Sequence, residues 1–411
     1  MKRISTLVIG AGQAGLAMSH CLTERSEPHV VLERGQIGNS WARERWDSLR
    51  MQSPNWQTRL PGHAYAGSDP DGYMTMPEVR AYLESYAAKS AAPVETGVTV
   101  TSVTRDDESH VVKTTKGTWR ATNVVLASGA CNQASIPGFA QDIPDSITQV
   151  SPLSYRRPSD LPEGGVLVVG ASATGVQLAA EIQASGRPVI LATGNHIRMP
   201  RRYRGHDITW LLEHSGLFSK TLENVDDINR VRSLPSLQLI GDRSCLFLDL
   251  NALQDMGVEI VGRLTGCRDG TLLFSGSLAN TAVLSDLKMN RALSAIDDWA
   301  LQSGLEFPEP PRRFAPTLVP AKPRLALPLA SGAISTIVWA SGFRPDMSWL
   351  QMPVFDGKGR IRHAGGIVAP GLYVLGLPFL RTRKSTFLDG VGDDARVLAQ
   401  HIADARLRQA A

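Results

Sequence analysis

Two short segments of this sequence have glycines at a spacing that suits pyrophosphate binding. Residues 10–15 (GAGQAG) and 170–175 (GASATG) each follow an apolar run and precede a helix-like segment. The first glycine permits a tight turn, the small middle residue lets the backbone approach the pyrophosphate, and the last lets the helix pack on the strand. Free N–H groups at the helix N-terminus then face the phosphates. We therefore expect the chain to bind two dinucleotides.

The residues around the first turn favour FAD as its ligand. Glu33 ends the next apolar segment, where a carboxylate accepts hydrogen bonds from an adenosine ribose. Residues 38–62 then contain Trp41, Trp46 and Trp56 among polar and basic residues. A large flat isoalloxazine ring needs such aromatic walls and hydrogen-bond donors. The alternative is that each tryptophan belongs to the core or to an interface.

The second turn differs in its polar residues. The strand end at 191–194 (LATG) has no carboxylate for the ribose, but Arg198, Arg201, Arg202 and Arg204 follow it closely. A guanidinium suits a 2′-phosphate, so NADPH is favoured over NADH. Ser172 in the middle position suits a looser, exchangeable ligand. The alternative is that this arginine cluster is a solvated basic surface.

These motifs need strands and helices to position them, and the sequence predicts an α/β fold. Residues 4–9, 16–22 and 29–34 form one β-α-β pattern, which restarts at Val166 and continues with a strand at 188–193. Prolines in 151–165 and 308–323 mark the connections. We predict two Rossmann-like domains, with an NADPH domain (151–324) inserted into an FAD domain (1–150 and 325–411). Strands at 333–341 and 371–378 are expected to rejoin the first sheet.

The overall composition is that of a globular protein. The net charge of +4 suits anionic cofactors and gives no reason to expect nucleic acid. Four scattered cysteines form no Cys-x-x-Cys pair, which argues against a dithiol-relay flavoprotein and favours a reducing compartment. We expect a cytoplasmic protein with no metal site and no membrane span. The sequence leaves the oligomeric state open, with a homodimer as one alternative.

Several segments together resemble the class B flavoprotein monooxygenases, which include flavin-containing monooxygenases and Baeyer–Villiger enzymes. They are the first turn with Glu33, the segment SLRMQSPNW (48–56), the second turn, and two Ala-Ser-Gly motifs at 127–129 and 340–342. GFRPD (342–346) and the last segment, 371–395, fit the same pattern. Two positions depart from it. Ser151 stands where the family has a histidine, and Gln52 where flavin-containing monooxygenases have an asparagine.

The resemblance implies an FAD- and NADPH-dependent monooxygenase that oxygenates a small N- or S-nucleophile with O₂ through a flavin C4a-(hydro)peroxide. Gln52 is its candidate catalytic residue. Baeyer–Villiger oxidation, which Ser151 disfavours, an NADPH oxidoreductase without oxygen insertion, and a non-catalytic nucleotide sensor are the alternatives. The residues expected to bind FAD are Gly10, Gly12, Gln13, Ala14, Gly15, Glu33, Arg34, Trp41, Trp46, Val100, Ala127, Ser128 and Gly129. Those expected to bind NADPH are Gly170, Ser172, Ala173, Thr174, Gly175, Arg198, Arg201, Ser341 and Gly342.

Overall fold

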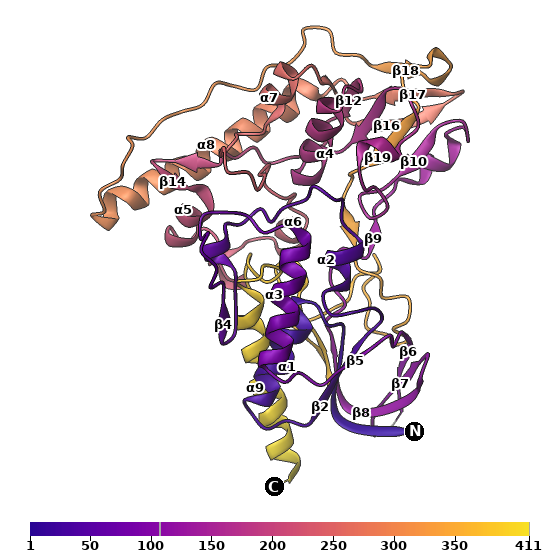
Figure 1. The fold of residues 1–411 in the computed structure, drawn as a ribbon, viewed down its shortest axis with the longest axis vertical. Coiled ribbons are helices and arrows are strands. Elements are labelled where there is room, and N and C mark those ends of the chain that lie inside the picture. The colour runs from indigo at the N-terminus through magenta and orange to yellow at the C-terminus, as the bar shows by residue number, and fades with distance from the viewer. Residues whose placement is uncertain (107, 411) are drawn as a thin grey trace.

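Two sheets, one in each lobe of the molecule, organise the chain in the computed structural model, which describes residues 1–106 and 108–410 (Figure 1). In the first sheet, β22, β8, β1, β2 and β5 lie side by side in parallel, and β21 pairs antiparallel with β22. Their bounds are β1 Lys2–Ile9, β2 His29–Glu33, β5 Val94–Thr96, β8 Gly117–Leu126, β21 Ile367–Ala369 and β22 Leu372–Val374. An antiparallel extension comprises β6 (Val100–Arg105) and β7 (His110–Thr114), which pairs with β8.

The second sheet is wholly parallel, in the order β10, β19, β11, β12, β15. Its strands are β10 Thr148–Val150, β11 Val166–Val169, β12 Val189–Ala192, β15 Glu259–Val261 and β19 Thr336–Trp339. A small antiparallel sheet of β16 (Leu264–Arg268), β17 (Thr271–Phe274) and β18 (Ala326–Pro328) lies beside it. The predicted fold class, α/β with two Rossmann-like domains, is confirmed.

Helices that have an apolar face pack beside these sheets. In the first domain α1 (Gln13–Thr23) packs against α9 (Val391–Ala410), and α3 (Met76–Lys89) lies nearby (Figure 1). In the second domain α4 (Ala173–Ala184) follows β11 and contacts α7 (Leu250–Asp255). The remaining helices are α2 (Asn39–Arg43), α5 (Ile208–His214), α6 (Ile228–Arg232) and α8 (Leu278–Ser303). Within residues 1–106 and 108–410, every helix is too short or too polar to span a lipid bilayer.

The seam between the domains differs from the predicted one. β19 does not rejoin the first sheet: it pairs with β10 and β11 in the second. The expectation for residues 333–341 was therefore wrong, whereas β22 does return to the first sheet. The chain passes between the lobes at a short antiparallel ribbon, β9 (Gln133–Ala134) with β20 (Phe343–Arg344). Strand pairing thus moves the inserted unit from the predicted 151–324 to about 135–342.

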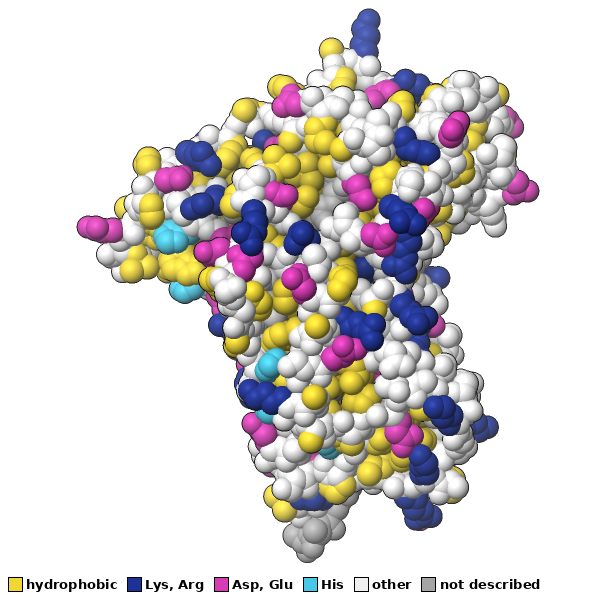
Figure 2. Space-filling view, in the orientation of Figure 1, with side chains coloured by type: hydrophobic (Ala, Val, Ile, Leu, Met, Phe, Trp, Pro, Cys, Tyr) yellow, Lys and Arg dark blue, Asp and Glu magenta, His cyan; other side chains and the backbone are white. Residues whose placement is uncertain are grey.

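The reason for this difference is a duplicated arrangement of strands. β8 lies beside β1, and β19 lies beside β11 in the same way. Each of these neighbouring strands runs directly into Ala-Ser-Gly, at 127–129 and 340–342. Each copy of the motif therefore serves the turn of its own sheet. Over the face shown in Figure 2, acidic and basic side chains are interspersed, in keeping with the net charge of +4.

Candidate active site

The first turn is shaped by close backbone packing on one side and open space on the other. Gly10 has φ +106°, and a Cβ there would lie 2.6 Å from the Ala127 carbonyl oxygen. A Cβ on Gly15 would lie 1.8 Å from the Gly10 carbonyl oxygen. At Gly12, in contrast, a Cβ would meet nothing within 4 Å. The space beside Gly12 is where a pyrophosphate would approach the helix N-terminus, so the turn fits a dinucleotide.

Glu33 lies at the ribose position of this turn. Its side chain is buried, and its two carboxylate oxygens accept hydrogen bonds from the Ala11 and Gly35 N–H groups, each at 2.8 Å. These bonds fix the carboxylate beside the turn, and each oxygen retains a lone pair for a ribose hydroxyl. Arg34, the next residue, forms an ion pair with Glu44.

Val100, one of the residues expected to bind FAD, lies in β6 and is paired with Thr114. Val98 is the residue that contacts the end of β2, because its N–H donates to the Glu33 carbonyl oxygen at 2.9 Å. Val98, and not Val100, is thus hydrogen-bonded to the end of β2. No motif in the sequence distinguishes these two valines.

The second turn repeats the geometry of the first. Gly170 has φ +109°, and its Cβ position is 2.3 Å from the Ala340 carbonyl oxygen. A Cβ on Gly175 would lie 1.7 Å from the Gly170 carbonyl oxygen. Ser172 is the N-cap residue of α4, but its side chain makes no capping hydrogen bond. The hydroxyl of Ser172 is thus available at the N-terminus of the helix, together with the N–H groups of residues 173 and 174.

The structure does not support Arg198 as a ligand for the 2′-phosphate. Its side chain is buried and forms hydrogen bonds from Nε to Asp249 at 2.7 Å and from Nη1 to Asp286 at 2.8 Å. Nη1 also donates to the Ala315 carbonyl oxygen at 2.7 Å. Two carboxylates of the chain therefore already neutralise this guanidinium. Arg198 thus joins the loop after β12 to the start of α7 and to α8.

Arg201 is engaged in the same way. Its side chain is 1% exposed, and both Nε and Nη2 donate to Asp207, the former at 2.8 Å. Nη1 donates to the Gln52 carbonyl oxygen, and the guanidinium lies 4.7 Å from the centre of the Tyr73 ring. Arg201 is thus a structural link between the two domains. The prediction that it binds NADPH is not supported, because its donors already have partners within the protein.

A different arginine lies at the end of β12. A Cβ built on Gly194 would be 3.7 Å from Nε and Nη2 of Arg263, which follows β15. Since β12 and β15 are parallel neighbours, their carboxyl ends meet at the same edge of the sheet. Arg263 is exposed, and in the part of the chain that the structure describes no side chain pairs with its guanidinium. Its position is far along the sequence from Gly194, so spacing could not reveal it.

Both turns open onto one cavity of about 450 Å³ between the domains. Gln13 from the first turn and Thr174 from the second line it. Trp41 also lines it and donates from Nε1 to Oε1 of Gln13 at 3.1 Å. Apolar side chains from both domains cover most of the remaining wall, among them Leu49, Met51, Phe218, Leu237, Phe343 and Phe387. The cavity joins the two turns and has aromatic walls, so it fits a flavin ring and a nicotinamide.

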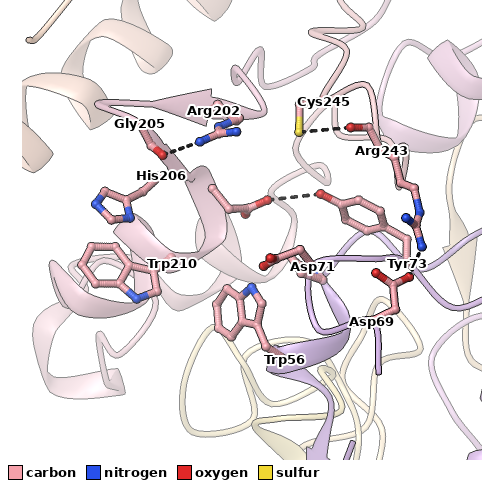
Figure 3. A pocket seen from close by; sticks show the side chains of 12 residues that line it. Trp56, Asp69, Asp71, Tyr73, Arg202, Gly205, His206, Trp210, Arg243 and Cys245 are labelled. Carbon is pink, nitrogen blue, oxygen red and sulfur yellow. Dashed lines mark hydrogen bonds and ion pairs between the residues drawn. The ribbon is translucent and has the colours of Figure 1, made fainter. Parts of the chain in front are cut away.

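The three tryptophans of the segment 38–62 have separate positions. Trp41 lies at the cavity, as predicted. Trp46 also reaches the cavity, but it is 5% exposed and packs mainly with the core of the second domain. Trp56 lies instead at another cavity of about 470 Å³, across from Trp210 (Figure 3). There Arg243 pairs with Asp69, and Tyr73 donates to Asp207 at 3.3 Å.

Gln52 lies on the wall of the cavity that joins the two turns. Its backbone carbonyl is held by Arg201, whereas its side-chain amide makes no hydrogen bond with the residues that the structure describes. Ser341 and Gly342 lie at the ribbon between the domains: the Ser341 hydroxyl donates to the Ser135 carbonyl oxygen at 2.7 Å. Phe343, the next residue, lines the cavity.

A buried polar cluster lies at the edge of the same cavity. Lys384 and Asp389 of the first domain form an ion pair at 2.8 Å, and Lys384 also reaches Glu213 of α5 at 3.1 Å. Gln57, which lines the cavity, donates to both carboxylates. Burial raises the pKa of Asp389, although Lys384 opposes the change. This cluster ties α5 to the segment before α9.

Residues 205–305, whose role the sequence did not reveal, supply much of the cavity wall. Phe218, Val231, Arg232 and the segment 234–237 face the first domain there. Their approach is fixed by contacts with the segment before α9: the Phe218 and Phe387 rings pack edge to face at 5.6 Å, and Arg232 Nε donates to the Phe379 carbonyl oxygen at 3.4 Å. No regular motif marks these residues in the sequence.

Comparisons with known proteins agree with this geometry. A family model described as pyridine nucleotide-disulphide oxidoreductase matches residues 7–206. An uncharacterised CzcO-like oxidoreductase from Geobacillus kaustophilus is 31% identical, over 97% of this chain and 98% of that protein. The chain belongs to the CzcO-like oxidoreductases. The four cysteines of this oxidoreductase are all free in the structure.

Solved structures of two flavoprotein monooxygenases share the fold of this chain. A flavin-containing monooxygenase from Stenotrophomonas maltophilia matches with a TM-score of 0.67 and 19% identity, over 98% of this chain and 99% of that one. A steroid monooxygenase bound to NADP matches with a TM-score of 0.53 and 19% identity, over 99% and 85%. These likenesses bear out the predicted two-domain α/β fold.

Proposed function

We propose that this CzcO-like oxidoreductase is a monooxygenase that uses NADPH and O₂ to oxygenate a small N- or S-containing nucleophile. One observation carries the proposal: a single cavity with apolar walls opens onto both dinucleotide turns, at Gln13 and Thr174. A hydride donor and its acceptor must meet, and these two residues lie on the wall of the same cavity. The flavin, once reduced, supplies the activation of O₂ in this chemistry.

The residues of the chain divide into two sets of ligands. Glu33 would hold the ribose of FAD, and the open space at Gly12 would receive its pyrophosphate. The second turn, with the free hydroxyl of Ser172, would receive the pyrophosphate of NADPH. Arg263 takes the place that Arg198 and Arg201 had in our sequence interpretation, because its guanidinium is exposed at the end of β12. A guanidinium there favours the 2′-phosphate.

The cavity wall has two tasks in such a reaction. Apolar side chains such as Leu49, Phe218 and Phe343 exclude water, which would otherwise compete for the activated oxygen. Gln52 has the second task. Arg201 fixes its backbone, so its unpaired side-chain amide can donate a hydrogen bond to the reacting oxygen from a constant position.

The test is a measurement of coupling. The protein loaded with FAD is reduced by NADPH without oxygen, then mixed with aerated buffer that contains methyl phenyl sulfide. We expect about one sulfoxide formed per NADPH consumed. Hydrogen peroxide without sulfoxide would instead favour an NADPH oxidoreductase that inserts no oxygen, an alternative in line with the family description. Turnover of phenylacetone to its ester in place of the sulfide would favour Baeyer–Villiger chemistry.

A further inference from the structure

Arg383 is a cation on the wall of the cavity without a partner. It lies between β22 and α9 and lines the cavity that joins the two turns. No carboxylate, hydroxyl or carbonyl group in residues 1–106 and 108–410 forms a hydrogen bond or ion pair with its guanidinium. The next residue, Lys384, contrasts with it, because Lys384 pairs with Asp389 and Glu213. Both carboxylates also pair with Arg59, so these acids are already neutralised by cations other than Arg383.

An unpaired, half-buried guanidinium on a largely apolar wall favours a bound anion. A buried charge is costly unless it is paired, and a guanidinium remains protonated in proteins. Burial lowers the pKa of Arg383, because its surroundings disfavour an isolated positive charge. Since no acidic side chain in residues 1–106 and 108–410 pairs with this half-buried guanidinium, an anion bound in the cavity would neutralise it.

The net positive charge of the cavity wall also favours an anionic ligand. Four arginines line the cavity: Arg45, Arg50, Arg232 and Arg383. The one acidic residue among the lining residues, Glu44, is paired with Arg34 outside the wall. Arg232 donates from Nε to the Phe379 carbonyl oxygen, which leaves its other two nitrogens free of partners in the described residues.

The position of Arg383 separates it from the sites of the coenzyme phosphates. Those phosphates are expected at the two turns, where backbone N–H groups bind them. Arg383 belongs to the segment of Phe379, Thr386 and Phe387, which meets the second domain at Phe218 and Arg232. An aromatic and apolar corner with cationic groups on its wall suits an organic anion with an apolar body.

We propose that the substrate of this cavity carries a carboxylate, which Arg383 binds through its guanidinium while the apolar part of the substrate lies against Phe218 and Phe387. This inference rests on the proposed function, since it names the substrate class for the same site. A guanidinium binds a carboxylate through two parallel N–H···O hydrogen bonds, so it fixes orientation as well as affinity.

The test compares (phenylthio)acetate with its neutral amide, (phenylthio)acetamide. Binding to the FAD-loaded protein is measured in the absence of oxygen by quenching of tryptophan fluorescence, because Trp41 and Trp46 line the cavity. We expect the acid to bind at least about 10-fold more tightly than the amide. Arg383→Met should raise the Kd of the acid about 10- to 100-fold and leave that of the amide unchanged. Arg383→Lys should restore part of the preference.

Control measurements distinguish the alternative anions. Arg291→Met, at an exposed position of α8, should change neither Kd. Flavin content and the Kd of NADPH are measured for each variant. If Arg383→Met loses flavin or NADPH affinity while the preference for the acid persists, a coenzyme phosphate is the partner and the proposal is overturned. Equal binding of acid and amide by the unmodified protein overturns it too. Because binding needs no oxygen, a preference for the acid without sulfoxide formation would refute the proposed function alone.

Discussion

The two dinucleotide turns have nearly the same backbone and different side chains around it. Gly10 and Gly170 have φ angles of +106° and +109°, and each lies against the carbonyl of the alanine in an Ala-Ser-Gly motif. The strand ends that follow are unlike. The first has Glu33, buried and held by two N–H groups. The second has Gly194, with Arg263 beside it.

This comparison shows that the shape of each turn and the choice of its ligand depend on different residues. The turn is set by packing within the protein: in both domains a Cβ on the last glycine would lie under 2 Å from a backbone oxygen. The ligand is selected by a side chain that a neighbouring strand brings to the same edge. A carboxylate suits two ribose hydroxyls, and a guanidinium suits a phosphate.

The largest effect should come from the first turn. Gly12→Val places a side chain in the space left for the pyrophosphate, where a Cβ meets no protein atom. We expect a folded protein without flavin absorbance near 450 nm. Gly15→Val is the contrasting variant, because its Cβ would clash with the Gly10 carbonyl and prevent folding. Flavin content and circular dichroism of both variants measure the two outcomes. Flavin retained by Gly12→Val would break the comparison.

The next effect is on stability, at the second domain. Arg198→Ala leaves Asp249 buried without its partner, so the free energy of unfolding should fall by about 3–5 kcal/mol. Denaturant titration measures this fall. Arg202→Ala is the matched control from the same basic segment: its side chain is exposed and bonds only the Gly205 carbonyl oxygen, so stability should change little. If Arg198→Ala left the free energy of unfolding unchanged and weakened NADPH binding, Arg198 would be a coenzyme ligand and its structural role would be refuted.

The smallest expected effect is on coenzyme choice at the second turn, and it tests the difference between the two turns most directly. Arg263→Ala should raise the Kd of NADPH about 10- to 100-fold through the loss of one charge-assisted contact. NADH lacks the 2′-phosphate, so its Kd should stay the same. Arg268→Ala, an exposed arginine at the end of β16, serves as the control. Parallel losses for both coenzymes would mean that Arg263 has a different role.

Much of the fold could be predicted from the sequence, because local signals mark it. Apolar runs followed by Gly-rich turns indicated β1 with α1 and β11 with α4, and the acid at 33 indicated the end of β2. The membership of β19 could not be predicted in this way. Its apolar residues fit either sheet, and only the pairing with β10 and β11 decides between them.

The candidate site could be predicted where its ligands belong to a turn, and less well elsewhere. Arg198 and Arg201 are close in sequence to β12, but nearness in sequence does not reveal that Asp249 and Asp207 neutralise them. Arg263 and Arg383 reach their places through β15 and through the segment before α9. Such residues have no fixed spacing to a motif, so a single sequence offers little sign of them.

The ribbon of β9 and β20 has a consequence for the modular design of the chain. Ala134 and Phe343 are paired, so the inserted unit leaves the flavin half and returns to it at almost the same point. Closing that gap needs only a tight turn, and the entropic cost of a loop depends weakly on its length. The second domain is therefore an insert whose two ends lie next to each other. An engineer could exchange it at this position for a domain with another coenzyme preference.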